Sequence, residues 1–386
     1  MGEIRKLYFA SFFLGLSTVA SVTFTLFFLL NGLNFSQISI LFSIFMISLA
    51  LLEIPTGAFA DTFGHKASVF LGMLIHAFSF LILSLGSSFS HFAIAMFLAA
   101  LGLAFQSGAI SSLIYELLGK IEKKEAFEKI HGKISALFIV ATIISGPIGA
   151  LIYKFYPRIP YLMAFVFIFV GAIFVFIVKW EFKKEKISLS VYTEKIRSGI
   201  KLTFSNAALI SFILIAISMT TIRMVFNQNI NQPYQLEIGL DVAYIGITAA
   251  IVAGFSALVA NYSYKISKKV GNLNSLLLMV FIPSLSAIIL SQINNLLGLV
   301  FITIFYLGHA YRDPALARLT QNEISSDYRS TVASTGSFVS SLIVGLTLPF
   351  YGNLMDQRGL NYTLIVLGAF SIAIGLIAVS IYKIRR

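Results

Sequence analysis

Apolar stretches long enough to cross a lipid bilayer recur along the whole chain. About 20 consecutive apolar residues form a helix that spans the hydrocarbon layer, and a spanning helix satisfies all of its own backbone hydrogen bonds. The sequence therefore predicts an all-α membrane protein with twelve transmembrane helices. The predicted spans cover residues 7–30, 36–59, 67–86, 92–117, 133–153, 160–179, 207–230, 241–263, 273–291, 296–318, 329–351 and 361–382.

The composition excludes several other classes of protein. Hydrophobic residues make up 58% of the 386 positions and charged residues only 11%, whereas a soluble domain carries about 25% charged residues. The net charge of +12 does not indicate a nucleic-acid partner, because the basic residues lie in short loops between apolar stretches. The chain has no cysteine, which excludes disulfides, thiolate metal sites and a cysteine nucleophile. We expect no metal and no cofactor.

The distribution of basic residues predicts the topology. With the N-terminus inside, 23 of the 28 Lys and Arg residues fall on the inner side and three on the outer side. The positive-inside rule then places both termini in the cytoplasm and requires an even number of helices. We expect the first helix to be retained, since no small-residue cleavage site follows the charged segment Met1–Lys6.

The longest connection divides the chain into two halves. It runs over 180–205 and is rich in Lys and Glu, so we expect a cytoplasmic linker with an amphipathic segment between a bundle at 1–179 and another at 206–386. The halves also share short patterns. Residues 104–109 read A-F-Q-S-G-A and residues 310–315 read A-Y-R-D-P-A, at an offset of 206. The first and seventh predicted spans begin at residues 7 and 207, which is close to the same offset. The common offset indicates that the two halves are parallel repeats.

A short polar hinge, Glu53–Lys66, separates the second and third predicted spans. Gly57, Asp61, Gly64 and Lys66 stand in it at the spacing G-x-x-x-D-x-x-G-x-K. Gly57 would let a neighbouring helix approach closely, and Gly64 would permit a tight turn with positive φ. Asp61 and Lys66 are charges placed where a helix leaves the membrane.

The hinge resembles the signature loop of the major facilitator superfamily, a family of secondary transporters. It departs from that loop at Thr62 and His65, where the family usually has basic residues. The resemblance implies two pseudo-symmetric six-helix bundles, and it gives Asp61 a gating role on the cytoplasmic side, where the loop holds the outward-open state. The expected gating residues are Gly57, Asp61, Gly64, Lys66, Glu53 and Glu116.

The predicted span 296–318 contains an unusual group of polar residues. Charged residues inside a membrane are costly and suggest function. His309 and Asp313 are four residues apart and so share a helix face, with Arg312 beside them. Because this helix lines the central cavity in the resembling family, we expect Asp313 to be a proton-coupling carboxylate. The alternative is a fixed ion pair that holds this helix against a neighbour.

Two further groups are candidates for the substrate path. Arg223 lies near the outer end of the span 207–230 and would pair with Asp313 or bind an anionic substrate. The amides that follow could bind a ligand, or the helix could end near Asn227 and leave them in a loop. Gln106 and Ser107 occupy the repeat positions of Arg312 and Asp313, and helix–helix hydrogen bonds explain them equally well. The predicted substrate or proton-coupling residues are Asp313, Arg312, His309, Arg223, Asn227, Gln228, Gln106 and Ser107.

Two segments favour export. Residues 146–149 read G-P-I-G and resemble an antiporter motif, although a simple proline kink is an alternative; the loop Asn322–Ser334 resembles that of bacterial drug exporters. We predict a monomeric antiporter of the cell inner membrane that exports a small organic molecule, driven by the proton gradient. The alternative is an importer or facilitator of a sugar, nucleoside or organic anion. The sequence shows no paired carboxylates, nucleophile–His arrangement or P-loop, so we do not expect an enzyme.

Overall fold

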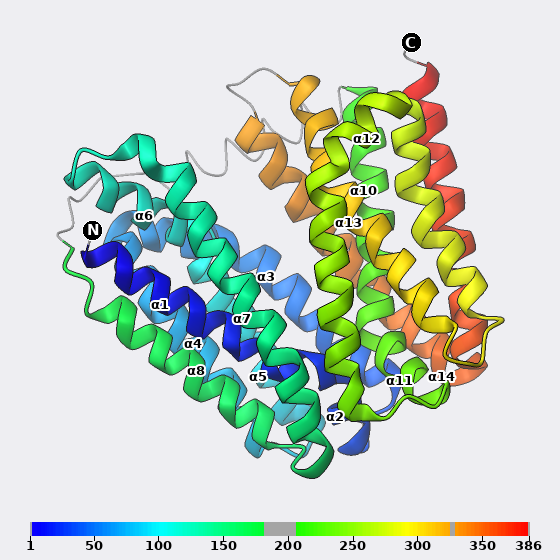
Figure 1. Ribbon diagram of the computed structural model, residues 1–386, viewed down its shortest axis with the longest axis horizontal. Helices are drawn as coiled ribbons and strands as arrows, with labels where there is room; N and C mark the ends of the chain where they lie inside the picture. Colours follow the sequence, from blue (N-terminus) through cyan, green and yellow to red (C-terminus); the bar gives the residue numbers. More distant parts are fainter. Residues whose placement is uncertain (1, 181–205, 325–328, 385–386) are drawn as a thin grey trace. The chain divides into compact units, whose positions relative to one another are not determined.

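The computed structural model describes residues 2–180, 206–324 and 329–384. Within these ranges every regular element is helical (Figure 1), which confirms the predicted all-α class. The predicted amphipathic segment of the linker 180–205, and the middle of the loop Asn322–Ser334, lie outside the described residues.

The first half of the chain follows the predicted spans closely. A break at Ser107 and Gly108 divides the fourth predicted span, and Gly108 has a positive φ of 71°. The elements are α1 (Gly2–Leu16), the 3-10 helix η1 (Ser17–Thr23), α2 (Phe24–Leu30), α3 (Phe35–Phe63), α4 (His65–Leu85), α5 (Phe89–Gln106), α6 (Ala109–Lys120), the 3-10 helix η2 (Lys124–Ala126), α7 (Phe127–Phe155) and α8 (Ile159–Phe176).

The second half contains two very long helices. The elements are α10 (Ala207–Val225), the π-helix η3 (Phe226–Ile230), α11 (Asn231–Glu237), α12 (Val242–Leu290), α13 (Gly298–Asn322) and α14 (Arg329–Ile384). At 49 and 56 residues, α12 and α14 would be about 74 and 84 Å long if straight. Each is interrupted by a non-helical glycine, Gly271 with φ 81° and Gly359 with φ 78°. Each is thus long enough for two membrane spans.

Nine helical stretches among the described residues are long and apolar enough to cross a bilayer. Two of them are α12 and the Ser334–Ile384 part of α14, and each of these helices corresponds to two predicted spans. The polar helix α13 is not one of the nine. The count of twelve therefore stays a prediction, although the structure has a helix at each predicted position.

The chain forms two compact units. The first comprises Met1–Phe27, Ile44–Val191 and Val242–Ala250, and the second comprises Phe28–Ser43, Tyr192–Asp241 and Ile251–Arg386. The division at 1–179, 180–205 and 206–386 remains a prediction about how the chain is organised.

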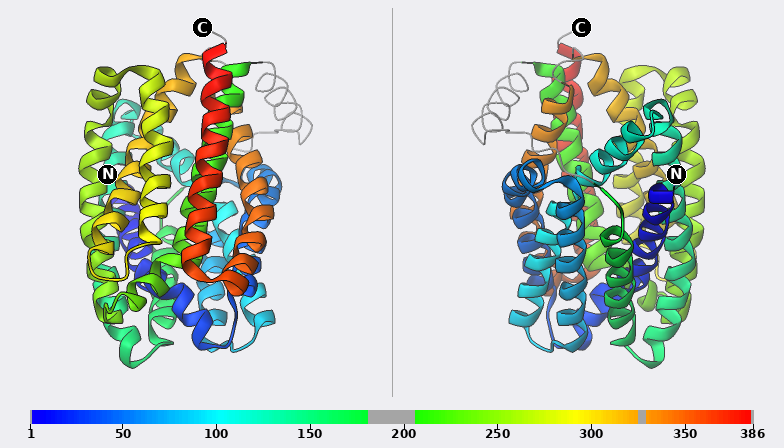
Figure 2. Two further views of the ribbon diagram at one scale, coloured as in Figure 1. Left: turned by 90° about the vertical axis from the view of Figure 1, so that its right-hand side faces the viewer. Right: turned by 90° about the vertical axis from the view of Figure 1, so that its left-hand side faces the viewer.

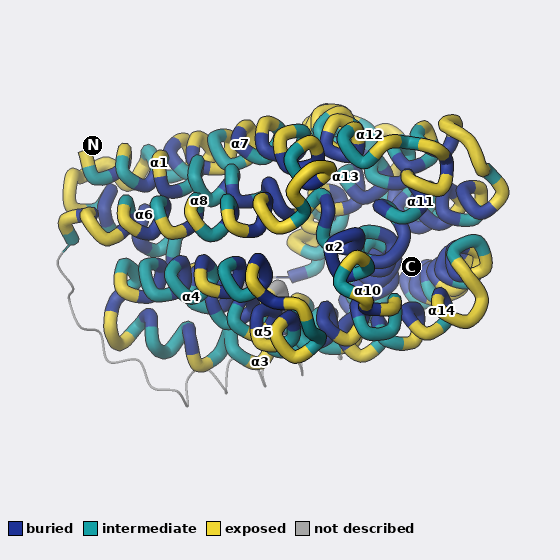
Figure 3. Tube along the Cα trace, turned by 90° about the horizontal axis from the view of Figure 1, so that it is seen from below, coloured by how far each residue is buried: buried dark blue, intermediate teal, exposed yellow. Residues whose placement is uncertain are grey.

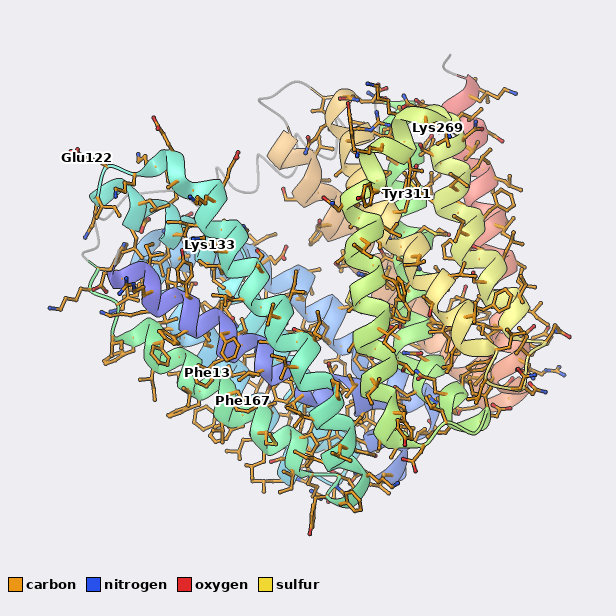
Figure 4. The ribbon with its side chains drawn as sticks, viewed as in Figure 1. Phe13, Glu122, Lys133, Phe167, Lys269 and Tyr311 are labelled. Atoms are coloured by element: carbon orange, nitrogen blue, oxygen red, sulfur yellow. The ribbon has the colours of Figure 1, made fainter. Side chains whose placement is uncertain are left out.

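Small residues and aromatic rings hold the first unit together. A Cβ atom on Gly72 of α4 would lie 2.6 Å from the carbonyl oxygen of Gly102 in α5, so only glycine allows this approach. Phe13 of α1 and Phe167 of α8 meet with ring centroids 6.3 Å apart (Figure 4). Along α7, exposed and buried positions alternate (Figure 3), and the exposed ones include Ile144, Ile148 and Leu151, as a lipid-facing surface requires.

The second unit is built around α10, which packs against α14 (Figure 2) and α13. Phe226 and Phe305 stack with centroids 4.2 Å apart and join η3 to α13. The start of α3 also belongs to this unit. Ser43 donates a hydrogen bond to the carbonyl oxygen of Gly345 in α14 at 2.6 Å.

Candidate functional site

The central ion pair of the second unit lies on α13. Arg312 donates from Nε to Oδ1 of Asp313 at 2.7 Å, and its Nη2 contacts the same oxygen. Its Nη1 donates to Oγ1 of Thr220 in α10 at 3.3 Å. Among the described residues, Asp313 forms its ion pair with Arg312 and not with Arg223, so the pairing of Arg223 with Asp313 suggested from the sequence is not formed.

His309 lies one turn before this ion pair and is almost fully buried, at 3% exposed. Within the described part of the chain, neither of its ring nitrogens has a hydrogen-bond partner. Its ring meets the ring of Phe305 edge-on at 4.8 Å. The side chain of Asp313 is 55% exposed, so the shared helix face expected from the spacing places one group in the interior and the other at a surface.

Arg223 lies near the end of α10 and is half-buried. Its Nε atom is buried and has no hydrogen-bond partner among the described residues. Two contacts between α10–η3 and α13 bring Arg223, His309 and Arg312 into one region. Arg312 donates to Thr220, three residues before Arg223. Tyr306, three residues before His309, donates to Asn227, four residues after Arg223. The three basic side chains, which we call the basic cluster, come from α10 and α13.

The amides after Arg223 do not form a loop. The helix continues through the π-helix η3 and α11 to Glu237. The alternative in which the helix ends near Asn227 is therefore wrong, because π-type and α-type backbone hydrogen bonds carry the helix past that residue. π-Helical turns are rare and often mark functional sites.

Hydrogen bonds among side chains connect these amides to α13. The hydroxyl of Tyr306 donates to Oδ1 of Asn227 and accepts from Nδ2 of Asn231 at 3.3 Å. Gln235 adds another hydrogen bond to this network, since its Nε2 donates to Oδ1 of Asn231 at 2.9 Å. Gln228 is half-buried in η3. Much of the hydrogen-bonding capacity of the amides is therefore used within the protein.

Sequence reasoning missed two members of this polar region. Tyr306 precedes His309 by three residues and so lies on the same side of α13, a spacing that could have drawn attention to it. Asn229 is 1% exposed and donates to Oγ of Ser39 in α3 at 2.7 Å. No sequence signal links Asn229 to Ser39, because 190 residues separate them.

Gln106 faces a cavity in the first unit. The cavity has a volume of about 440 Å³ and lies among α1, α4, α5, α6, α7 and α8. Nε2 of Gln106 donates to the carbonyl oxygen of Gly102 at 3.0 Å, and Oε1 is buried without a partner among the described residues. Ser111 and His131 add polar groups to the wall, and Oγ of Ser111 lies 3.3 Å from Nε2 of His131. The apolar wall includes Leu7, Ala10, Leu14, Val69, Met73, Phe138 and Ile139.

Ser107 is placed differently from its neighbour. It is exposed, is not part of the cavity wall, and donates a hydrogen bond to Oε1 of Glu53 at 3.4 Å. Gln106 and Ser107, the repeat positions of Arg312 and Asp313, are thus placed apart. Gln106 lines a cavity, and Ser107 links the end of α5 to α3.

The polar hinge brings together an acidic pair around a histidine. Gly64 has the positive φ predicted for it, 96°. Oε1 of Glu116 in α6 lies 2.6 Å from Nδ1 of His65, and Oδ1 of Asp61 lies 3.9 Å from its Nε2. Gly57 lies within α3 and Lys66 within α4, where the ammonium of Lys66 is 5.7 Å from the ring centroid of Phe176. His65, a departure from the family pattern, is therefore the residue that joins the two carboxylates.

The G-P-I-G segment of α7 is a site of close helix packing. A Cβ atom on Gly149 would lie 1.9 Å from the carbonyl oxygen of Val19 in η1. A Cβ atom on Gly246 of α12 would lie 2.1 Å from the carbonyl oxygen of Gly146. Pro147 lies inside α7. Both glycines of the segment therefore lie at backbone-to-backbone contacts, in addition to any kink at the proline.

Comparisons with known proteins point to one family. The sequence profile of the Major Facilitator Superfamily matches residues 7–347. Multidrug resistance protein 2 of Bacillus subtilis (strain 168) is 24% identical over 365 residues, which cover 92% of this chain and 88% of that protein. Multidrug resistance protein 1 of the same organism is 21% identical over 358 residues, which cover 88% and 89%. The crystal structure of the nucleoside transporter NupG has a TM-score of 0.84 at 11% identity, covering 99% of this chain and 100% of that chain.

Proposed function

Because the chain belongs to the Major Facilitator Superfamily, we propose that this membrane transporter exports a small amphipathic organic molecule in exchange for protons. The observation that supports this most is the cavity of the first unit. Its volume of about 440 Å³ suits a small molecule. Apolar walls with a few polar groups favour a ligand that is largely apolar. The names of the two Bacillus relatives, multidrug resistance proteins, agree with export.

In the proposed mechanism, two six-helix halves alternate access to a site near the middle of the membrane. Both termini lie in the cytoplasm, the protein works as a monomer in the cell inner membrane, and no cofactor takes part. The proton gradient drives the cycle through Asp313. Protonation of this carboxyl would weaken its ion pair with Arg312 and shift the balance between conformations.

The polar hinge is the proposed gate. Gly57, Gly64 and Lys66 position the connection between α3 and α4, and Asp61 takes part in closing it. Glu53 of α3 and Glu116 of α6 assist: Glu53 accepts from Ser107, and Glu116 contacts His65. A gate of this kind requires interactions that hold in one conformation and release in the other.

Reconstituted vesicles test this proposal. A pH gradient is imposed in either direction, and the movement of a fluorescent amphipathic dye is followed. The wild type is expected to move the dye against the proton flow, and Asp313→Asn is expected to abolish this coupled movement while the protein stays folded. Glu122→Gln, a change at an exposed carboxylate after α6 (Figure 4), is the matched control. Unchanged proton-driven movement in Asp313→Asn would refute the role of this carboxylate.

A second candidate is an importer or facilitator of a polar solute. The basic cluster favours it, since Arg223 and His309 have donor or acceptor atoms without partners among the described residues. The same vesicles separate the two candidates. A facilitator would move a labelled sugar, nucleoside or organic anion down its own gradient with no pH difference, whereas the proposed exporter would not.

A further inference from the structure

We infer that the basic cluster of Arg223, His309 and Arg312 binds a carboxylate carried by an organic ligand. The site would lie between α10 and α13 in the second unit. The inference rests on the proposed function only in assuming that the ligand is the transported molecule. It specifies one chemical group of that molecule, which the proposed function leaves open.

The packing of α13 directs Arg312 toward α10. The preceding residue, Tyr311, lies beside α12 (Figure 4), where its hydroxyl donates to Oγ of Ser275 at 2.9 Å and lies 3.0 Å from Oγ of Ser267. These bonds hold one side of α13 against α12. Arg312, the next residue, then reaches Thr220 of α10, which puts its guanidinium on the side where Arg223 lies.

The charges in this region do not balance. Among the described residues, Asp313 forms an ion pair with Arg312, and Arg223 forms none. Arg312 is 7% exposed and Arg223 is half-buried. Arg223 is therefore a partly desolvated positive charge without an ion-pair partner among the described residues. Such a charge is unfavourable, and an added anion would relieve it.

Hydrogen-bonding groups without partners point to the same ligand. The buried Nε of Arg223 and both ring nitrogens of His309 have no partner among the described residues. A neutral imidazole offers one N–H donor, and a guanidinium offers several. The neighbouring hydroxyl of Tyr306 is already engaged by Asn227 and Asn231. A carboxylate has two acceptor oxygens, enough to take a bond from Arg223 and another from His309.

A ligand can reach this region without unfolding of the helices. The side chain of Asp313 is 55% exposed, although that of its partner Arg312 is only 9% exposed. The cluster therefore has one edge at a surface.

A neutral carbonyl group could also accept these hydrogen bonds, but it would leave the positive charge uncompensated. Matched ligand pairs separate the two cases. Purified protein in detergent is titrated with a panel of aromatic carboxylic acids, each paired with its primary amide, and the dissociation constants are measured by calorimetry. Wild-type protein is expected to bind at least one acid about tenfold or more tighter than its amide, the difference typical of a charge-assisted hydrogen bond.

Variants then locate the preference. Arg223→Gln keeps an amide donor but removes the charge, and it is expected to eliminate the preference for the acid. Arg318→Gln is the control, because Arg318 lies on α13, six residues after Arg312, and its Nη2 donates to Oδ1 of Asn272 at 3.1 Å. This control is expected to keep the preference. If Arg223→Gln does not fold, Arg223→Lys is used in its place. Because lysine retains the positive charge, this variant should keep at least part of the preference for the acid.

The inference is overturned if wild-type protein prefers no acid over its amide. It is also overturned if Arg223→Gln keeps the full preference, or if Arg318→Gln removes it equally. These are binding measurements in detergent, so they do not depend on coupling or direction. Failure of proton-driven transport in vesicles would overturn the proposed function and leave the carboxylate site supported by its own result.

Discussion

Asp356 of α14 is expected to hold the first turn of α3, and its replacement by alanine should loosen that turn. Oδ1 of Asp356 accepts from the backbone N–H of Phe35 at 2.9 Å. Oδ2 accepts from the backbone N–H of Ser36 at 2.8 Å and from its hydroxyl at 2.5 Å. The first amides of a helix have no partner within the helix, so a side chain from a distant helix acts here as the cap.

The size of the effect follows from these contacts. Removing a capping side chain costs about 0.5–2 kcal/mol, and losing a negative charge near a helix N-terminus adds roughly 0.3–1 kcal/mol. Asp356 is exposed, so solvent screening favours the lower part of the combined range. We therefore expect a local destabilisation of about 1–2 kcal/mol in Asp356→Ala, which corresponds to an opened first turn that is about 5–30-fold more populated.

Hydrogen exchange measured by mass spectrometry reads this opening directly. Peptides containing Phe35 and Ser36 should exchange about 5–30-fold faster in Asp356→Ala, if exchange reports the local opening equilibrium. Asp356→Asn should give a smaller change, because asparagine can still accept a hydrogen bond. Ser36→Ala removes only the hydroxyl contact and should also change exchange less. Equal exchange of these peptides in wild type and Asp356→Ala would refute the capping role.

Two further predictions concern the first unit. Gly149→Ala would place a Cβ atom 1.9 Å from the carbonyl oxygen of Val19, so thermal unfolding in detergent should show a loss of about 1–3 kcal/mol. Gly132→Ala on the same helix meets nothing within 4 Å and should be neutral or stabilising, and equal effects of the two changes would contradict the packing argument. A double-mutant cycle of His65→Ala and Glu116→Ala should give a coupling energy of about 0.5–1 kcal/mol. Additive effects would show that their 2.6 Å contact contributes nothing.

Hydropathy and glycine chemistry were sufficient to predict the helices and their main turns. A helix occupies each predicted span, and Gly64 adopts the positive φ predicted for it, 96°. These features depend on residues close together in the sequence. Apolar length decides where a helix can span the membrane, and the absence of a side chain decides where the backbone can turn sharply.

The arrangement of the polar groups was less accessible from the sequence. The contact of Asp356 with Phe35 joins residues 321 positions apart, and the contact of His65 with Glu116 joins residues 51 apart. Such contacts depend on how helices pack, which apolar periodicity does not specify. The π-helix η3 was likewise missed, since no simple residue pattern distinguishes it from the end of an α-helix.

The most direct test of the account is the direction of dye movement in vesicles that contain the purified wild-type protein. With the vesicle interior acidic, proton-coupled exchange predicts that an amphipathic dye accumulates inside while protons leave, and that reversing the pH gradient reverses the movement. Dye that moves together with the protons, or that only equilibrates regardless of the pH gradient, would contradict proton-coupled export.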